Sequence, residues 1–235
     1  MKDMIVTLLS EMPLWKLAVS ALILAFLIVF REPVWRIISA VAQIGIWIGG
    51  AMLFAAAMIV TAEVLLRKGV GALLGTSFLF SGSDEISGYL FAVGTSLSLA
   101  HVLVHRGHVR IDVLYIQFSS RARAIMDITA LLVMAIFVAA LLERAVDVAA
   151  TSYVEQIRSN TQLRIPLAWS QIPWAFGIAL FFLAILVALI RSLAAVAKGD
   201  WLAVNRISGV ATTEEEIATE LKGLDVHSRK PSQGT

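Results

Sequence analysis

The sequence predicts an all-α integral membrane protein with four core transmembrane helices and an extra N-terminal one. The first reason is composition. Of the 235 residues, 59% are hydrophobic and only 15% are charged, whereas a soluble domain is about half apolar and about a quarter charged. The second reason is that the apolar residues gather in blocks. Crossing about 30 Å of hydrocarbon takes about 20 apolar residues of helix, and several blocks have that length.

Four blocks are predicted to form the core spans. They cover residues 37–66, 86–104, 124–142 and 172–190. The second of these helices is expected to begin at Ser83-Asp84-Glu85. The Ser83 side chain would cap free N–H groups, and the two carboxylates would face the positive end of the helix dipole.

The N-terminal block, residues 14–30, is shorter, and it reaches membrane-crossing length only if Lys16 extends its charge toward the interface. It is predicted to span, and a re-entrant or surface-lying helix is the alternative. It is not predicted to be a signal peptide, because Arg31-Glu32-Pro33 stands where a small-residue cleavage site would follow.

The blocks divide the chain into three regions: an N-terminal extension over 1–36, a membrane domain over 37–200, and a tail over 201–235. In the tail, Thr213 and Glu216 have the spacing of a capping box and predict a short amphipathic helix.

The distribution of basic residues predicts the orientation. Residues 105–123 carry four arginines and one acidic residue, whereas residues 143–171 carry three arginines and three acidic residues. Cytoplasmic loops of membrane proteins are enriched in Lys and Arg. The 105–123 loop and the C-terminus are therefore predicted to be cytoplasmic.

Small residues on two spans predict close helix packing. Gly88, Ala92, Ser96 and Ala100 recur every four residues, and Gly45 and Gly49 form a second pair. Such residues let another helix backbone approach closely. The spacing alone does not say whether that helix belongs to the same chain or to a partner.

Three histidines, His101, His105 and His108, share one helix face at i, i+4 and i+7. This spacing is compatible with a metal site or with an axial haem ligand. A haem held by two histidines would need a second one on a facing helix, and Gly107 is expected to end this helix before His108. The favoured interpretation is a polar helix end. The alternative is a haem-binding membrane anchor of a redox complex that uses His101 or His105.

The sequence contains no motif typical of an enzyme, a cofactor site or a nucleic-acid-binding protein. There is no cysteine, which excludes disulfides and thiolate chemistry. No nucleophile motif, phosphate-binding glycine loop or HExxH motif is present, and the net charge of +2 gives no indication of nucleic-acid binding. The middles of the spans hold no ionisable residue, unlike those of a chain that forms a transport pathway alone. We therefore expect neither an enzyme nor a cofactor.

The run DEISGYLFAVGTSLSLAHVLVHRGHVRIDVLY, residues 84–115, resembles the signature region of the DctQ-like family. These are the small membrane subunits of tripartite ATP-independent periplasmic (TRAP) transporters. That family has an acidic residue that opens one span and a basic Gly-His stretch that leaves it. The matching residues here are Glu85, Arg106, Gly107, His108, Arg110 and Asp112. The later stretch TQLRIP, residues 161–166, is similar to what the family places before its last span.

The resemblance implies a bacterial inner-membrane protein that is a non-catalytic scaffold in a sodium-coupled symporter. Its partners would be a large membrane subunit, which holds the substrate and sodium sites, and a periplasmic binding protein that delivers an organic acid. Four basic residues are candidates for docking that protein: Arg67, Lys68, Arg158 and Arg164. The small-residue faces would meet the large subunit, and Asp112 would pair with Arg106 or Arg110 to hold the turn. A membrane scaffold without a transport partner is a third possibility. In the TRAP interpretation, the residues that select the substrate would lie on the other two subunits.

Overall fold

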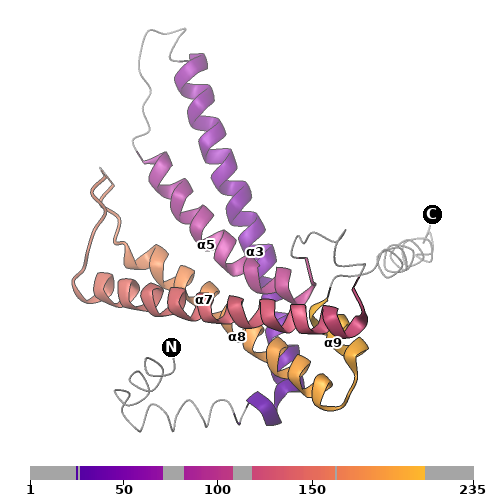
Figure 1. The fold of residues 1–235 in the computed structure, drawn as a ribbon. Coiled ribbons are helices and arrows are strands. Elements are labelled where there is room, and N and C mark those ends of the chain that lie inside the picture. The colour runs from indigo at the N-terminus through magenta and orange to yellow at the C-terminus, as the bar shows by residue number, and fades with distance from the viewer. Residues whose placement is uncertain (1–24, 26, 71–81, 108–117, 162, 210–235) are drawn as a thin grey trace, which may run out of the picture.

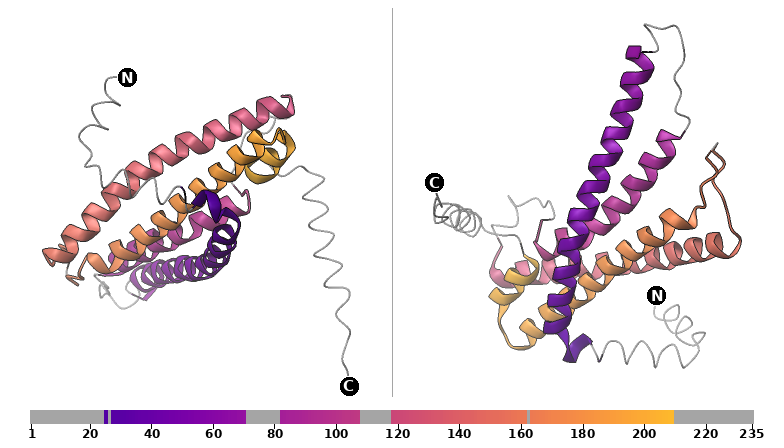
Figure 2. Two further views of the ribbon diagram at one scale, coloured as in Figure 1. Left: turned by 90° about the horizontal axis from the view of Figure 1, so that it is seen from below. Right: turned by 180° about the vertical axis from the view of Figure 1, so that it is seen from behind.

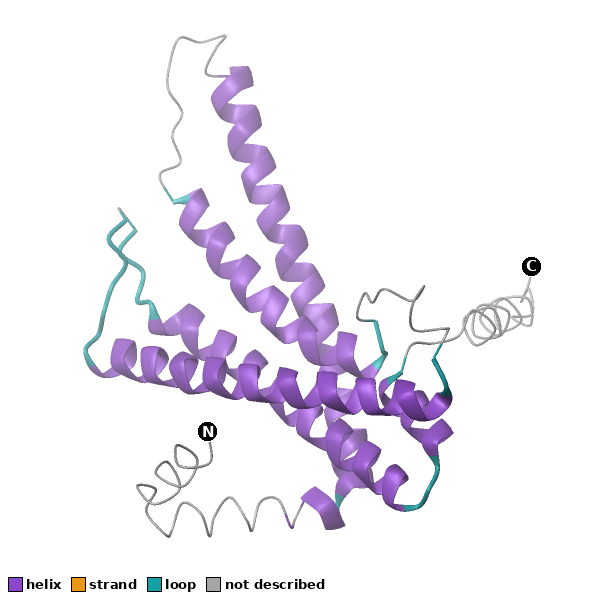
Figure 3. Ribbon diagram, in the orientation of Figure 1, coloured by secondary structure: helices purple, strands orange, loops and turns teal. Residues whose placement is uncertain are grey.

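The computed structural model describes residues 25, 27–70, 82–107, 118–161 and 163–209. Figures 1 and 3 show this part of the chain as helices joined by turns and loops. The elements are α3 (Arg31–Leu65), the π-helical turn η1 (Leu66–Val70), α5 (Ser83–Val104), α7 (Ser120–Val154), α8 (Ala168–Ala197) and α9 (Trp201–Ser208). Four of these helices are long and apolar enough to cross a membrane. The predicted all-α fold with four core spans is confirmed.

Each spanning helix is longer than its apolar block. The largest extension is in α7, which continues twelve residues past the predicted end at residue 142, to Val154. Glu143 and Arg144 follow directly where the apolar block stops, and both are good helix formers that continue the helix. Arg144 and Asp147, which helical geometry places side by side at i,i+3, form a pair at 3.7 Å with both side chains exposed.

Two expected segments lie outside the described residues. The N-terminal block is described only at residues 25 and 27–30, where the chain is helical up to a turn at Phe30. The helix expected from Thr213 and Glu216 also falls outside. The short helix α9, in contrast, was not predicted.

The start of α5 corrects one prediction. The helix begins at Ser83, as expected, but Gly82 is its N-cap residue and no side chain caps it. The Ser83 hydroxyl instead donates a hydrogen bond to the carboxylate of Glu63 on α3. The serine therefore joins two helices and does not close the end of its own.

The four long helices form two antiparallel hairpins, α3–α5 and α7–α8, that cross each other. In the left view of Figure 2 α8 lies between α7 and the α3–α5 pair. It carries the largest set of buried residues and packs against α3, α5, α7 and α9. The hairpins diverge toward the end where α3 stops and α5 begins (Figures 1 and 2).

Glycines bring the helices close together. A Cβ atom on Gly45 would lie 2.7 Å from the Leu97 carbonyl oxygen, and one on Gly49 would lie 2.5 Å from the Gly94 carbonyl oxygen. A Cβ atom on Gly177 would lie 2.6 Å from the Ser96 carbonyl carbon. Larger residues at these positions would force the backbones apart, so these glycines set the spacing of α3, α5 and α8.

The helix α9 closes one end of the bundle. Gly199, with φ +74°, turns the chain after α8, and the Asp200 side chain accepts a hydrogen bond from the Ala203 N–H at 2.9 Å. Val204 is then fully buried against Ala124 and Ala195. Gly199 is typical of a residue that ends a helix, and Asp200 is typical of one that begins the next. This pair could therefore have predicted α9 from the sequence.

Candidate functional site

The bundle has two polar ends, joined by helices whose middles are apolar. We call them the hairpin end (Glu63–Val70, Gly82–Glu85 and residues 155–167) and the arginine-rich end (Arg31–Arg36, Val104–Gly107, residues 118–123 and Arg191–Ser208). Polar contacts tie the two helical hairpins together at both ends. These contacts, and the side chains they leave exposed, form the candidate functional site.

At the hairpin end, the loop between α7 and α8 is a short antiparallel ribbon. The Ser159 N–H donates to the Ile165 carbonyl and the Leu167 N–H to the Ile157 carbonyl, both at 3.0 Å. Gln156 and Arg164 have positive φ values of 53° and 46°. The Gln156 side chain donates to the Tyr153 carbonyl at 2.7 Å. These contacts give the loop a defined shape although it is largely exposed.

Glu85 fastens this ribbon to α5. One carboxylate oxygen accepts a hydrogen bond from the Tyr89 hydroxyl at 2.6 Å, and the other accepts one from the Thr161 hydroxyl. The Ser159 hydroxyl in turn donates to the Thr161 hydroxyl oxygen at 3.0 Å. Beside this contact, Leu163 packs directly on Gly82. A carboxylate that accepts from two hydroxyls holds them in one geometry, so Glu85 positions the loop.

The ribbon encloses a polar recess of about 480 Å³. It is lined by Gln156, Arg158, Ser159, Asn160, Thr161 and Arg164. Both arginines are exposed, and the Arg158 guanidinium donates to the Arg164 carbonyl at 3.4 Å. The structure thus brings together two of the four basic residues that the sequence singled out.

The other two basic residues lie elsewhere. Arg67 and Lys68 are exposed on the π-helical turn after α3. In Figure 1 this turn is at the tip of the α3–α5 hairpin, apart from the ribbon. The four residues therefore form two groups on one end of the bundle.

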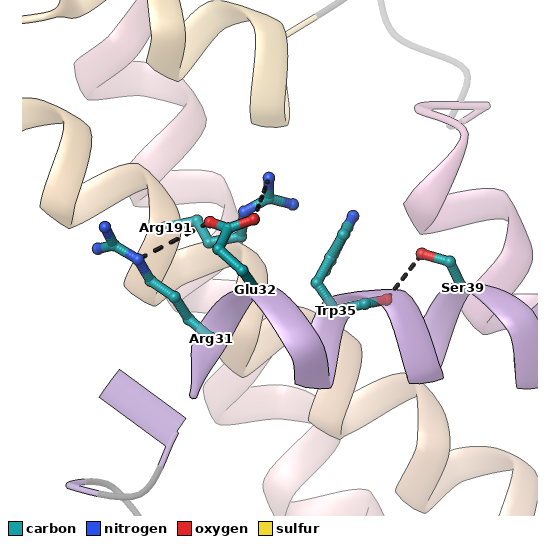
Figure 4. A network of polar contacts seen from close by, with 5 residues as sticks. All are labelled: Arg31, Glu32, Trp35, Ser39 and Arg191. Carbon is teal, nitrogen blue, oxygen red and sulfur yellow. Dashed lines mark hydrogen bonds and ion pairs between the residues drawn. The ribbon is translucent and has the colours of Figure 1, made fainter. Parts of the chain in front are cut away.

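At the arginine-rich end, Glu32 lies between two arginines. Its carboxylate is 3.4 Å from the Arg191 guanidinium of α8 and 3.8 Å from that of Arg31. Figure 4 shows the three side chains together with Trp35 and Ser39. The Arg191 guanidinium carbon lies 4.8 Å from the centre of the Trp35 ring, within the range of a cation–π contact.

This contact was not predicted from the sequence. It joins the first turn of α3 to the last part of α8 across about 160 residues of chain, and spacing rules describe only neighbours on one helix. The available signal was that Glu32 and Arg191 border spans on the same predicted side of the membrane.

The two described histidines stack on each other. The rings of His101 and His105 lie 3.9 Å apart, and the His105 Nδ1 is 3.1 Å from the His101 carbonyl oxygen. Stacked rings on adjacent turns cannot reach opposite faces of one iron, so this pair offers one axial ligand at most. His108 lies outside the described residues, among which no three His, Asp or Glu side chains are grouped to hold a metal ion.

A comparison with protein-family models identifies the kind of protein. The model for the DctQ component of tripartite ATP-independent periplasmic transporters matches residues 56–195, which is more than half of the chain. The chain belongs to the DctQ family. No curated protein and no solved structure gave a match. As a DctQ component, the chain is the small membrane subunit of a TRAP transporter and a multi-pass inner-membrane protein.

The DctQ match includes the signature region, of which part is described. Gly107 does not itself adopt the left-handed conformation that ends α5; Arg106 does, with φ 55°. The Arg106 N–H donates to the Leu103 carbonyl and the Gly107 N–H to the Val102 carbonyl, which is a Schellman motif. His108, Arg110 and Asp112 lie outside the described residues, so the pairing of Asp112 stays a prediction.

The small-residue faces of this DctQ chain are used mostly inside it. Gly45, Gly49, Ser96 and Ala100 are buried between its own helices. Gly88 is exposed, with nothing within 4 Å of a Cβ placed there, and Ala92 is partly exposed. The four buried positions are therefore not available to a partner.

Asp127 is a buried acidic residue whose burial the sequence did not predict. It lies two turns inside α7 and is only 2% exposed. Its position near the start of the predicted span 124–142 gave no indication of burial; α7 packs against α8 and α9. Asp127 belongs to the interior of the bundle at the arginine-rich end.

Proposed function

We propose that this chain is the non-catalytic scaffold of a sodium-coupled TRAP symporter for an organic acid. It would support the large permease subunit in the membrane and help a periplasmic binding protein to dock. The observation that carries the proposal is the arginine-bearing ribbon, which Glu85 holds in place at one end of a bundle whose helices are apolar in their middles. A shaped and exposed basic loop is suited to a soluble partner, and spans without central charges are suited to a supporting role.

The binding protein would dock at the hairpin end, on the periplasmic side, with the C-terminus in the cytoplasm. Arg158 and Arg164 would meet acidic side chains of the binding protein. Exposed charges of this kind guide association and weaken with salt. Arg67 and Lys68, on the neighbouring tip, would add to the same positive field.

A docking experiment with purified components tests this role. In vesicles that contain both membrane subunits, the variant Arg158→Ala/Arg164→Ala should bind the binding protein at least about tenfold more weakly, as expected for losing two interfacial charges. The variant Arg158→Lys/Arg164→Lys is the control, because it keeps the charges and also loses the guanidinium contact within the ribbon. Wild-type docking by the alanine variant would contradict the proposed docking site.

Two further measurements test the scaffold and its orientation. The large subunit should co-purify with this chain in mild detergent, and its absence would contradict the scaffold role. Because the chain has no cysteine, single cysteines report sidedness directly. In spheroplasts, a membrane-impermeant maleimide should label Asn160→Cys and leave Lys198→Cys unlabelled.

A further inference from the structure

Two grooves of similar size can be compared on the lipid-facing surface of the described helices. One, of about 650 Å³, lies on α3 and is lined by Gln43, Trp47, Gly50, Ala51, Phe54 and, from α5, His101. The other, of about 670 Å³, lies on α7 and is lined by Ile125, Met126, Thr129, Ala130, Val133 and Phe137. We call them the α3 groove and the α7 groove. They differ in their polar groups.

The α3 groove holds polar groups that lipid cannot satisfy. Gln43 is exposed, and Trp47 is 75% exposed. The His101 Nδ1 is buried and has no hydrogen-bond partner in the described part of the chain. In the α7 groove, the Thr129 hydroxyl donates to the Ile125 carbonyl of its own helix at 2.8 Å. That groove needs no further hydrogen bond.

The polar groups of the α3 groove lie at membrane depth. Between Arg36 and Glu63 there is no charged residue for 26 positions, which is about 39 Å of helix. Trp47 and Gly50 are near the middle of this stretch. Gln43 is about 10 Å from the middle, inside a hydrocarbon core whose half-thickness is about 15 Å. Polar side chains at such depth almost always face protein.

Gly50 adds a notch to this face. Unlike Gly45 and Gly49, which pack against α5, it is exposed, and a Cβ atom there would meet nothing within 4 Å. The bulky side chains of Trp47 and Phe54, 75% and 69% exposed, stand on either side of it along α3. This gap has the shape that receives a side chain from another helix.

We propose that the α3 groove binds one transmembrane helix of the large membrane subunit. That helix would present a hydroxyl or amide group to the exposed Gln43 side chain and insert a bulky apolar side chain at Gly50. The inference rests on the proposed function, because the DctQ family membership supplies the large subunit as a membrane partner. It goes further in assigning the face, the depth and the chemistry of the contact.

Two other occupants fit the groove less well. In a parallel two-fold dimer, equal residues meet at the axis, so Trp47 would face Trp47 and hold the helices apart where Gly50 permits a close approach. The apolar block at residues 14–30 of this chain offers Ser20 as its only hydroxyl or amide side chain. A helix of the large subunit can carry an amide as well as a bulky apolar side chain, whereas this block could offer Gln43 only the Ser20 hydroxyl.

Photo-cross-linking distinguishes these occupants. Benzoylphenylalanine would replace Ala51 in the α3 groove or, as the matched control, Ala130 in the α7 groove. Both chains would be made in membranes that also contain the tagged large subunit. We expect a covalent adduct with the large subunit from position 51 and none from position 130. An adduct at position 51 with a second copy or within the chain would overturn the proposal, as would large-subunit adducts from position 130 only.

Substitutions give an independent test. Gly50→Leu projects into open space, so the isolated chain should fold normally, while co-purification of the large subunit should fall at least about tenfold. Ala130→Leu should assemble like the wild type. Gln43→Leu should reduce assembly severalfold, and Gln43→Asn should restore part of it. Circular dichroism and gel filtration of each purified variant verify its fold.

The outcomes separate the two proposals. If wild-type chains assemble and support uptake while Gly50→Leu and Gln43→Leu assemble equally well, the groove assignment fails and the scaffold function stands. If the wild-type chain never associates with the large subunit, the proposed function itself fails.

Discussion

The two ends of the bundle use a carboxylate for the same task in different ways. At the hairpin end, Glu85 accepts hydrogen bonds from the neutral hydroxyls of Tyr89 and Thr161. At the arginine-rich end, Glu32 is paired with Arg31 and Arg191, and Arg191 also covers the Trp35 ring. Each contact joins one helical hairpin to the other.

This difference between the Glu85 and Glu32 contacts determines which end of the bundle has exposed charges for binding a partner. Among the described residues Glu85 pairs with hydroxyls and with no basic residue, and Arg158 and Arg164 beside it stay exposed. Glu32 partly neutralises the arginines around it, and the aromatic ring covers one of them. The hairpin end is therefore shaped by neutral contacts and keeps its cations for a partner, while the arginine-rich end uses some of its cations to hold the fold together.

The largest effect should come from breaking both ends at once. Gly177→Leu would place a side chain against the Ser96 backbone, pushing α8 from α5 and loosening both contacts. Overpacking of this kind costs about 3 kcal/mol, measured as a loss of unfolding free energy in detergent. Gly88→Leu is the control because its Cβ meets open space. It should be neutral or slightly stabilising, since leucine is the better helix former. Equal destabilisation by both would contradict the packing described.

Breaking the hairpin end alone should release the ribbon without unfolding the bundle. Glu85→Ala removes the acceptor of both hydroxyls, so trypsin should cleave at Arg158 and Arg164 about tenfold faster. Glu85→Gln keeps one acceptor oxygen, so its cleavage rate should lie between those of the wild type and Glu85→Ala. Glu143→Ala, an exposed acidic residue on α7, should leave the cleavage rate unchanged. Unchanged cleavage in Glu85→Ala would show that Glu85 does not hold the loop.

The sequence predicted what depends on local patterns. The spans followed from block length and hydropathy, and the start at Ser83 followed from a run of polar residues before an apolar block. Helical spacing likewise accounts for the pair between Arg144 and Asp147. Each of these features is set within a few residues of chain, so one sequence contains the whole signal.

The contacts that shape the candidate site depend on residues far apart in the chain. Glu85 meets Thr161 across 76 positions, and Glu32 meets Arg191 across the whole membrane domain. Small-residue spacing showed that Gly49 would lie at a close contact but not that Gly94 would be opposite. The role of Ser83 was misjudged for the same reason. The sequence predicted that its side chain would cap its own helix, whereas its hydroxyl donates a hydrogen bond to Glu63 on α3.

Breaking the arginine-rich end alone should have a smaller effect that depends on salt. Arg191→Gln removes an ion pair and a cation–π contact from a side chain that is 21% exposed, and should cost about 1 kcal/mol at low salt. Part of this difference should disappear at 0.5 M salt, since the Debye length there is only about 4 Å. Arg191→Lys keeps the positive charge, so it should lose only about half as much unfolding free energy as Arg191→Gln. Thermal unfolding in detergent at both salt concentrations measures these values. A larger loss at high salt would contradict the electrostatic account.

The smallest effect should come from the exposed ion pair between Arg144 and Asp147, which joins neither end. Both side chains are mostly solvent-exposed, at 78% and 61%, so water screens the charges and the pair competes with side-chain entropy. Arg144→Ala should change the unfolding free energy by about 0.3 kcal/mol, the value typical of a helical i,i+3 pair. The double variant Arg144→Ala/Asp147→Ala should show a coupling no larger than that. A coupling above about 1 kcal/mol in the unfolding free energy of the chain in detergent would contradict the exposed position of this pair.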